Sequence, residues 1–237
     1  MSIQSYEELL ALKEVGSICR LALGKMAERL RPGIPTAEWA EVGAKVMREN
    51  GARSAPAMVY GFPGEICISL NDEAVHGIPS ERPIRTGDLV KLDVTCEKGG
   101  YMADAAITVP VEPVRDEARR LVSCAARARN RVREIGRAVE REARRSGFSV
   151  IRELGGLGIG RTIHESPSGP NYNDRKARQQ LTPGPVITVE PIIALGEGAL
   201  VTAADGWTER TVDESLSAHF EHTIVVTERA PILLTAA

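Results

Sequence analysis

Two aspartates on a predicted β-hairpin are the first residues whose types and spacing could do chemistry. Residues 89–95 alternate between apolar and polar side chains, which is typical of a strand with Asp93 on its polar face. If residues 97–100 form a four-residue turn, Asp93 lies directly opposite Asp104, with Cβ atoms about 4.5–5.5 Å apart. Carboxylates at this separation repel each other, so a shared proton, a basic partner or a metal ion must offset the repulsion. Aspartate pairs on hairpins are also common on protein surfaces, so this pair needs support from elsewhere in the chain.

Three later residues supply that support. Glu190 interrupts the apolar run 186–193 and Glu221 interrupts the run 219–226, although a buried carboxylate is costly unless it is paired or bound to a metal. His164 ends a glycine-rich segment, where a lone histidine is more often structural. His222 points to the strand face opposite Glu221, and we interpret it as structural.

Four carboxylates and one imidazole together predict two divalent ions bridged by carboxylates. Oxygen-rich ligation with one imidazole suits Mn, Fe, Co or Zn. Such a pair of ions lowers the pKa of a bridging water and stabilises both oxygens of a hydrolytic intermediate. The predicted ligands are Asp93, Asp104, His164, Glu190 and Glu221.

The elements that position these residues alternate between pairs of helices and groups of strands. Ser5 followed by Glu8 indicates a capping box at the start of the first helix, and Arg31-Pro32-Gly33 ends that helix. The expected helices are residues 5–30, 36–50, 115–129 and 131–146, and the expected strands are 65–70, 88–96 and 101–109, with further strands and loops over 148–227.

A shift of 97 residues aligns the two halves of this order. It lays Gly87 over Gly184 and Asp93 over Glu190, so each half has a carboxylate six residues after a glycine. Few other residues are identical, so coincidence is the alternative interpretation. We expect a single domain over residues 1–237, made of similar halves at 1–110 and 111–237, with acidic residues meeting at the seam.

Length and composition exclude several classes of protein. With 237 residues, 43% hydrophobic and 26% charged, the composition is that of a globular chain rather than a disordered or collagenous one. No apolar run approaches the roughly 20 residues of a bilayer span, and no signal-peptide pattern is present, so we expect no membrane partner. The four cysteines form no CxxC pair, which favours reduced thiols in a cytoplasmic protein.

The net charge of −2 is unevenly distributed. Between Arg115 and Arg145 lie 11 arginines and 5 acidic residues, a net charge of +6 that leaves −8 for the rest of the chain. Such a stretch is usually the solvated face of helices. The alternative is a docking surface for an anionic partner such as ribosomal RNA, although the stretch has no aromatic residue to stack on bases.

The motifs around these residues resemble those of type I methionine aminopeptidases in the pita-bread peptidase family. The resemblance covers essentially the whole chain. It implies an α+β fold, with a curved, mainly antiparallel sheet backed by helices and divided into two pseudo-symmetric halves. The matching segments are Cys67-Ile-Ser-Leu-Asn-Asp-Glu-Ala-Val-His76-Gly-Ile-Pro79, Lys91-Leu-Asp93-Val94 with Asp104, Gly158-Ile-Gly-Arg-Thr-Ile-His164-Glu165, Thr188-Val-Glu190-Pro191, Asp205-Gly-Trp207-Thr208 and Ser217-Ala-His-Phe-Glu221-His-Thr-Ile-Val-Val-Thr227.

The resemblance also implies a role for each matching residue. Asp93 would be a bidentate ligand, Asp104 and Glu221 would bridge the two ions, and His164 and Glu190 would complete the shell of the first ion. Glu190 would also handle the proton of the attacking water, and His76 would hydrogen-bond the scissile amide. The residues matching the pocket for the methionine side chain are Phe62, Cys67 and Trp207.

Four positions near the implied site depart from the family pattern. Leu157 and Tyr60 stand where histidines are usual, and Asn171 replaces a histidine that contacts the substrate carbonyl. His219 stands where glutamine is common. None of the four is an implied metal ligand, so the departures put the rate of turnover in doubt rather than the ion pair. We expect Asn171 to remain a substrate-binding residue, with Asn171 or His219 partly taking over the missing histidine's role.

The activity implied by the resemblance is removal of the initiator methionine from peptides and nascent proteins whose second residue is small. The spacings of 26 residues from His164 to Glu190 and 31 from Glu190 to Glu221 leave no room for the helical insertion of type II enzymes. The alternatives are a related peptidase of the aminopeptidase P or prolidase kind, and a weakly active relative that binds peptides or RNA. The family is usually monomeric, so we expect a monomer.

Overall fold

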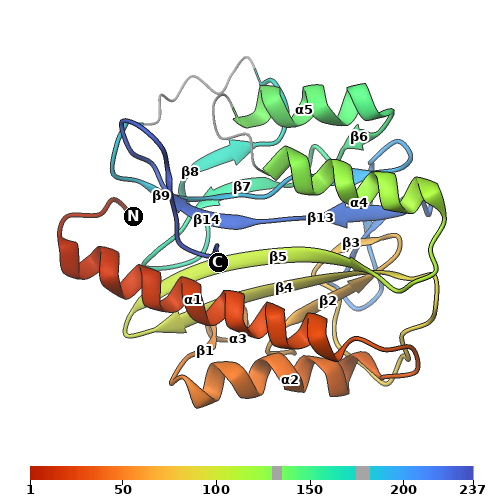
Figure 1. Ribbon diagram of the computed structural model, residues 1–237, viewed down its shortest axis with the longest axis horizontal. Coiled ribbons are helices and arrows are strands. Elements are labelled where there is room, and N and C mark those ends of the chain that lie inside the picture. The colour runs from red at the N-terminus through yellow and green to blue at the C-terminus, as the bar shows by residue number, and fades with distance from the viewer. Residues whose placement is uncertain (130–134, 175–181, 237) are drawn as a thin grey trace.

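The computed structural model describes residues 1–129, 135–174 and 182–236. Helices lie on the outside with strands between them: α1 and α2 cover one side of the molecule, and α4 and α5 cover the other (Figure 1). All strand pairs found among the described residues are antiparallel. The predicted α+β class with mainly antiparallel sheets is therefore confirmed.

The helices form where the sequence predicts them, with one addition. Ser5 caps α1 by accepting a hydrogen bond from the Glu8 N–H, and the Glu8 carboxylate accepts from the Gln4 N–H at the same end of the helix. Helix α3 was not predicted; Ser54 caps its start, and Gly61 ends it in the left-handed conformation.

The helices are α1 (Tyr6–Arg29), α2 (Thr36–Glu49), α3 (Ala55–Tyr60), α4 (Asp116–Arg129) and α5 (Ile135–Ser146). For the last of these, the predicted residues 131–134 lie outside the described part of the chain.

The strands form four sheets. The first has the order β1-β4-β2 with β5 on β4, and the largest has the order β15-β14-β9-β7-β8; the other two are β13-β10-β6 and β11-β12-β3. The strands are β1 (Arg53–Ser54), β2 (Cys67–Leu70), β3 (Glu73–Val75), β4 (Leu89–Lys98), β5 (Tyr101–Pro110), β6 (Ser149–Val150), β7 (Gly155–Gly158), β8 (Glu165–Pro170), β9 (Val186–Val189), β10 (Ile192–Ala194), β11 (Leu200–Thr202), β12 (Glu209–Thr211), β13 (Ser217–His219), β14 (His222–Val225) and β15 (Ile232–Leu233).

The hairpin of β4 and β5 has a shorter turn than the sequence predicts. Gly99 and Gly100 alone connect the strands, with φ angles of 59° and 80°, because two consecutive glycines adopt left-handed conformations without steric cost. The predicted four-residue turn and the pairing of Asp93 with Asp104 are therefore wrong: Asp104 lies opposite Thr95, and Asp93 lies opposite Ala106. Because the register differs by two residues, both aspartates still share one face of the hairpin.

Each side of the molecule packs its helices on a separate apolar core. Helix α1 runs across β4 and β5 (Figure 1), and the fully buried Trp39 of α2 donates from Nε1 to the Met26 carbonyl at 2.8 Å. Helices α4 and α5 bury small residues together with Phe148 and Ile193 in a second cluster. This arrangement agrees with the idea of two similar halves, whose duplication stays a prediction. Among the described residues, no helix has the length and apolarity needed to cross a membrane.

Candidate metal centre

A cavity of about 400 Å³ is lined by strands β4 and β5 on one side and by residues of β7, β10 and β13 on the other. The residues predicted as metal ligands all line it, and so do most of those predicted around the substrate. Its wall includes Asp93, Asp104, His164, Glu190, Glu221, His76, Phe62, Cys67 and Trp207.

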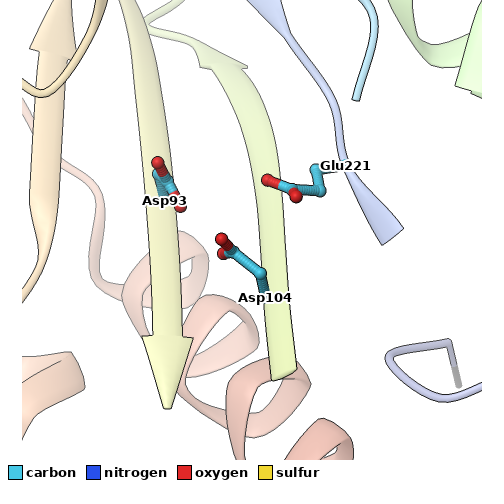
Figure 2. A group of neighbouring side chains, drawn as sticks. All are labelled: Asp93, Asp104 and Glu221. Carbon is cyan, nitrogen blue, oxygen red and sulfur yellow. The ribbon is translucent and has the colours of Figure 1, made fainter. Parts of the chain in front are cut away.

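Three carboxylates meet inside this cavity. Asp93 projects from β4, Asp104 from β5 and Glu221 from the segment between β13 and β14, and their side chains point toward one another (Figure 2). One oxygen from each lies within 4.8 Å of the other two. We call these residues the carboxylate trio.

Hydrogen bonds between β5 and the C-terminal strands bring the carboxylate trio together. Thr223 Oγ1 accepts from the Asp104 N–H at 2.8 Å and donates to the Asp104 carbonyl at 2.7 Å. The Glu221 N–H donates to the Ala106 carbonyl at 2.9 Å. Two segments more than 100 residues apart in sequence are thereby fixed side by side at the level of the acids.

The carboxylate trio is strongly perturbed by its surroundings. Burial and the neighbouring Glu221 raise the pKa of Asp104 to about 7, and burial raises the pKa of Glu221 to about 7. Burial, with Asp104 and Glu221 nearby, also holds the pKa of Asp93 well above its usual range. At neutral pH these groups must therefore either hold protons or be balanced by a partner of positive charge.

That partner is not the lysine on the same strand face. Lys91 is buried, and its Nζ donates to the Asn71 carbonyl at 2.6 Å and to Ser217 Oγ at 3.2 Å. Meanwhile Asp93 Oδ1, Asp104 Oδ1 and Glu221 Oε1 are buried without a hydrogen-bond partner among the described residues. Convergent, unsatisfied carboxylate oxygens are the donor set that a divalent cation requires, so the residues present fit a metal site.

Glu190 and His164 lie beside the trio on the same cavity wall. Glu190 directly follows β9, and its Oε2 accepts from Thr188 Oγ1 at 2.9 Å; burial, and then Glu221, hold its pKa well above the usual range. His164 lies between β7 and β8 with φ at 60°, a conformation that non-glycine residues rarely adopt. Tyr60 Oη lies 2.5 Å from His164 Nδ1. Tyr60 is one of the four predicted departures from the pattern of the motifs.

The apolar end of the cavity adjoins the carboxylates. Phe62 and Trp207 pack edge to face, with ring centroids 5.3 Å apart and planes at 83°. Cys67 lies directly opposite Asp93 in the pairing of β2 with β4. His76, also with a positive φ of 58°, lines the same cavity, and burial lowers the pKa of its ring. The backbone strain at two cavity histidines is typical of functional sites.

The remaining departures from the family pattern fall into different positions. Leu157 lines the cavity, and its N–H donates to Thr188 Oγ1 at 3.0 Å. Asn171 is fully buried behind Glu190, to whose backbone carbonyl its Nδ2 donates at 2.7 Å, rather than on the cavity wall. His219 lines the cavity close to Glu221, and burial lowers the pKa of its ring to about 4.

Some contributors to the site are not apparent in the sequence. Thr188 lies within a motif segment, but its hydrogen bond to the Glu190 carboxylate forms because β9 ends at Val189, immediately before Glu190. Thr223 clamps Asp104 across two strands. Tyr60 is predicted near the site, but its contact with His164, about 100 residues later in the chain, is not. Spacing along the chain carries no signal for contacts of this range.

The chain belongs to metallopeptidase family M24, whose model matches residues 11–228. The fold, the converging acids and the family together define a metallopeptidase-type site. The chain is 42% identical to "Methionine aminopeptidase 2" of Bacillus subtilis (strain 168), over 99% of both chains. The resemblance to methionine aminopeptidases inferred from the motifs is therefore confirmed.

Solved structures agree on the architecture. The methionine aminopeptidase from Rickettsia prowazekii superposes with a TM-score of 0.94 at 31% identity, and all of both chains is covered. The prolidase from Pyrococcus furiosus has a TM-score of 0.78 at 22% identity, covering 99% of this chain and 65% of the other. The latter likeness concerns the fold alone, and it confirms the expected pita-bread architecture.

Proposed function

We propose that this chain is a metal-dependent aminopeptidase that removes methionine from the N-terminus of peptides and nascent proteins. The observation that carries the proposal is the carboxylate trio, with its unsatisfied oxygens, beside an apolar slot in a chain of family M24. The requirement for a small second residue rests on the resemblance of the motifs.

Two divalent ions are proposed, held by the carboxylate trio and completed by His164 and Glu190. Bound there, the ions would lower the pKa of a coordinated water and stabilise the charge that develops on the scissile carbonyl. The donor set of oxygens with imidazole is compatible with Co, Mn, Fe or Zn.

The chain's own residues supply the proton transfers and the orientation. Glu190 takes the proton of the attacking water and returns it to the leaving amine, because its carboxylate is buried beside the trio with a pKa held well above the usual range. Thr188 fixes the Glu190 carboxylate for this task. His76 donates a hydrogen bond to the scissile amide, and its lowered pKa keeps the ring neutral at pH 7.

Selection of methionine follows from the apolar end of the cavity. Phe62 and Trp207 form an aromatic corner, and Cys67 adds a soft sulfur opposite Asp93. An unbranched thioether fills such a slot without strain and gains favourable contacts between sulfur and the ring edges. A β-branched or charged side chain gains neither.

The alternative functions are a peptidase of the aminopeptidase P or prolidase kind and a binding module without catalysis. Metal-stripped protein is assayed with Met-Ala-Ser and with an Ala-Pro peptide after addition of Co, Mn, Fe or Zn. The proposal predicts release of methionine from the first peptide and little cleavage of the second. Preferred cleavage of Ala-Pro supports the prolidase-like alternative, and cleavage of neither peptide with any metal supports the binding module.

The cellular setting is proposed to be a cytoplasmic monomer that meets nascent chains at the ribosome. A surface hollow on α4 and α5 is lined by Arg119, Arg120, Arg127 and Arg145, which supports contact with an anionic partner. Two of these arginines are also ion-paired, Arg119 with Glu112 and Arg127 with Glu142. Replacing Arg120 and Arg145 by glutamate should reduce co-sedimentation with ribosomes at low salt, and unchanged co-sedimentation contradicts the docking proposal.

A further inference from the structure

A histidine that belongs to none of the predicted ligand sets lies beside Glu221 of the carboxylate trio. His219 is 2% exposed, and neither of its ring nitrogens has a hydrogen-bond partner among the described residues. Its Nε2 lies 3.5 Å from Glu221 Oε2, which is longer than a good N–H···O hydrogen bond. Burying an imidazole whose two nitrogens make no hydrogen bond costs folding free energy. A partner outside the described residues would remove this cost.

The backbone that carries the His219 ring is held on both sides. The His219 N–H donates to Thr108 Oγ1 at 2.8 Å, and the same hydroxyl donates to the His219 carbonyl at 2.8 Å. On its other side, β13 pairs with β10, so His219 lies opposite Ile192. Strands on both sides therefore fix the backbone that carries the imidazole.

The distance between His219 and Glu221 is that of two ligands sharing one ion. Donor atoms bound at about 2.1 Å to the same cation lie about 3.0–3.5 Å apart, whether the geometry is octahedral or tetrahedral. A hydrogen-bonded pair would have closed to about 2.9 Å. The observed 3.5 Å therefore fits shared coordination better than direct bonding.

We propose that His219 Nε2 is an additional ligand of the divalent ion that Glu221 binds, so that the metal centre has two imidazole ligands, His164 and His219, instead of one. This inference rests on the proposed metal centre and goes beyond it, because the resemblance implies no ligand at position 219. The idle nitrogens, the burial and the distance to Glu221 carry it together.

A second imidazole has a consequence for the choice of metal. Nitrogen donors favour Co, Zn and Fe over Mn, which is better served by carboxylates and water. Loss of His219 should therefore weaken Co and Zn binding much more than Mn binding. A purely structural role for His219 would change the affinity for all metals alike.

The test counts coordinated imidazoles directly. In Co(II)-loaded protein, the ring N–H of each bound histidine gives a strongly shifted, exchangeable proton NMR line. The spectrum is recorded for wild type, His219→Gln and His164→Ala, with His222→Ala as the matched control, because the His222 ring bonds Thr235 Oγ1 instead. With only four histidines in the chain, each line can be assigned by substitution.

We expect two such lines in the wild type, the loss of a different one in His219→Gln and in His164→Ala, and both lines in His222→Ala. Loss of a group that only hydrogen-bonds a metal ligand typically lowers metal affinity about 10–100-fold. Loss of a ligand should cost no less, so the affinity of His219→Gln for Co(II), measured by calorimetry, should fall at least about tenfold. A single line in the wild type overturns the proposal even if the variants fold poorly, and so does a His219→Gln spectrum that keeps every line. The NMR lines report metal binding and do not require catalysis. A protein that shows both lines but does not cleave Met-Ala-Ser would therefore refute the proposed function without refuting His219 as a metal ligand.

Discussion

Removal of the metal should make the stability of this protein fall as the pH rises through neutrality. Asp104 has a folded-state pKa of about 7, raised by burial and by Glu221 from the usual 3.8. The folded chain therefore holds more protons than the unfolded chain between about pH 4 and pH 7. The contribution of Asp104 to the free energy of unfolding is fully present below pH 3.8, the pKa in the unfolded chain, and it is lost as the pH rises through about 7, the pKa in the folded chain.

The size of the effect follows from the pKa of Asp104. A rise from 3.8 to about 7 corresponds to about 4 kcal/mol of unfolding free energy, at about 1.4 kcal/mol per pH unit. About 2 kcal/mol of this falls between pH 5.5 and pH 8, where measurement is convenient. Glu221, whose pKa also rises to about 7 on burial, adds a decrease of the same sign.

The assay is urea unfolding in EDTA, followed by circular dichroism from pH 5.5 to pH 8, on wild type and Asp104→Asn. Because the amide cannot ionise, the variant should show a shallower pH slope, and its stability relative to the wild type should rise by about 2 kcal/mol from pH 5.5 to pH 8. Glu28→Gln, which alters an exposed ion pair with Lys25, is the control and should follow the wild type. With Co(II) present the order should reverse, because only the wild type keeps the full site.

The reasoning is refuted if metal-free wild type has the same stability at pH 5.5 and pH 8. It is refuted equally if Asp104→Asn is destabilised at pH 8 to the same degree as at pH 5.5. Either result means that the carboxylates are not held together as charged groups in the folded chain.

Three further substitutions test other parts of the site. Tyr60→Phe removes the hydroxyl at His164 Nδ1 and should weaken metal binding about tenfold by calorimetry, and unchanged affinity would exclude a supporting role. Asn171→Ala leaves the buried Glu190 carbonyl unbonded and should cost about 1–3 kcal/mol in urea unfolding; a loss below 0.5 kcal/mol, a threshold well under the roughly 1 kcal/mol of a typical hydrogen bond, contradicts this. Trp207→Ala opens the apolar slot and should raise KM for Met-Ala-Ser about tenfold with little change in kcat, whereas a loss confined to kcat would place Trp207 outside the slot.

Local signals predicted the long elements of the fold well. The first helix has apolar residues at helical spacing and a Ser5 cap, and these are properties of neighbours in sequence. Helix α3 was missed because a helix of six residues has too few positions to show a period. The hairpin register was missed because it depends on whether Gly99 and Gly100 turn alone, which is a choice of backbone conformation rather than of pattern.

The candidate site divides in the same way. The acids were predictable because a carboxylate such as Glu190 within an apolar run is costly to bury unless it has a partner, and such a residue is visible in the sequence. The position of Asn171 behind Glu190, and the idle nitrogens of His219, could not be predicted, because both depend on how strands from different parts of the chain pack. Supporting contacts of this kind become visible only when the strands are assembled.

The carboxylate trio is proposed to bind the metal that methionine removal requires. The most direct test is a titration of metal-free protein with Co(II), in which bound metal and methionine released from Met-Ala-Ser are measured in the same samples. We expect no release without metal, release that rises with bound metal up to two ions per chain, and no release from Asp104→Asn at any concentration. Release by the metal-free protein, or undiminished release by Asp104→Asn, would contradict it.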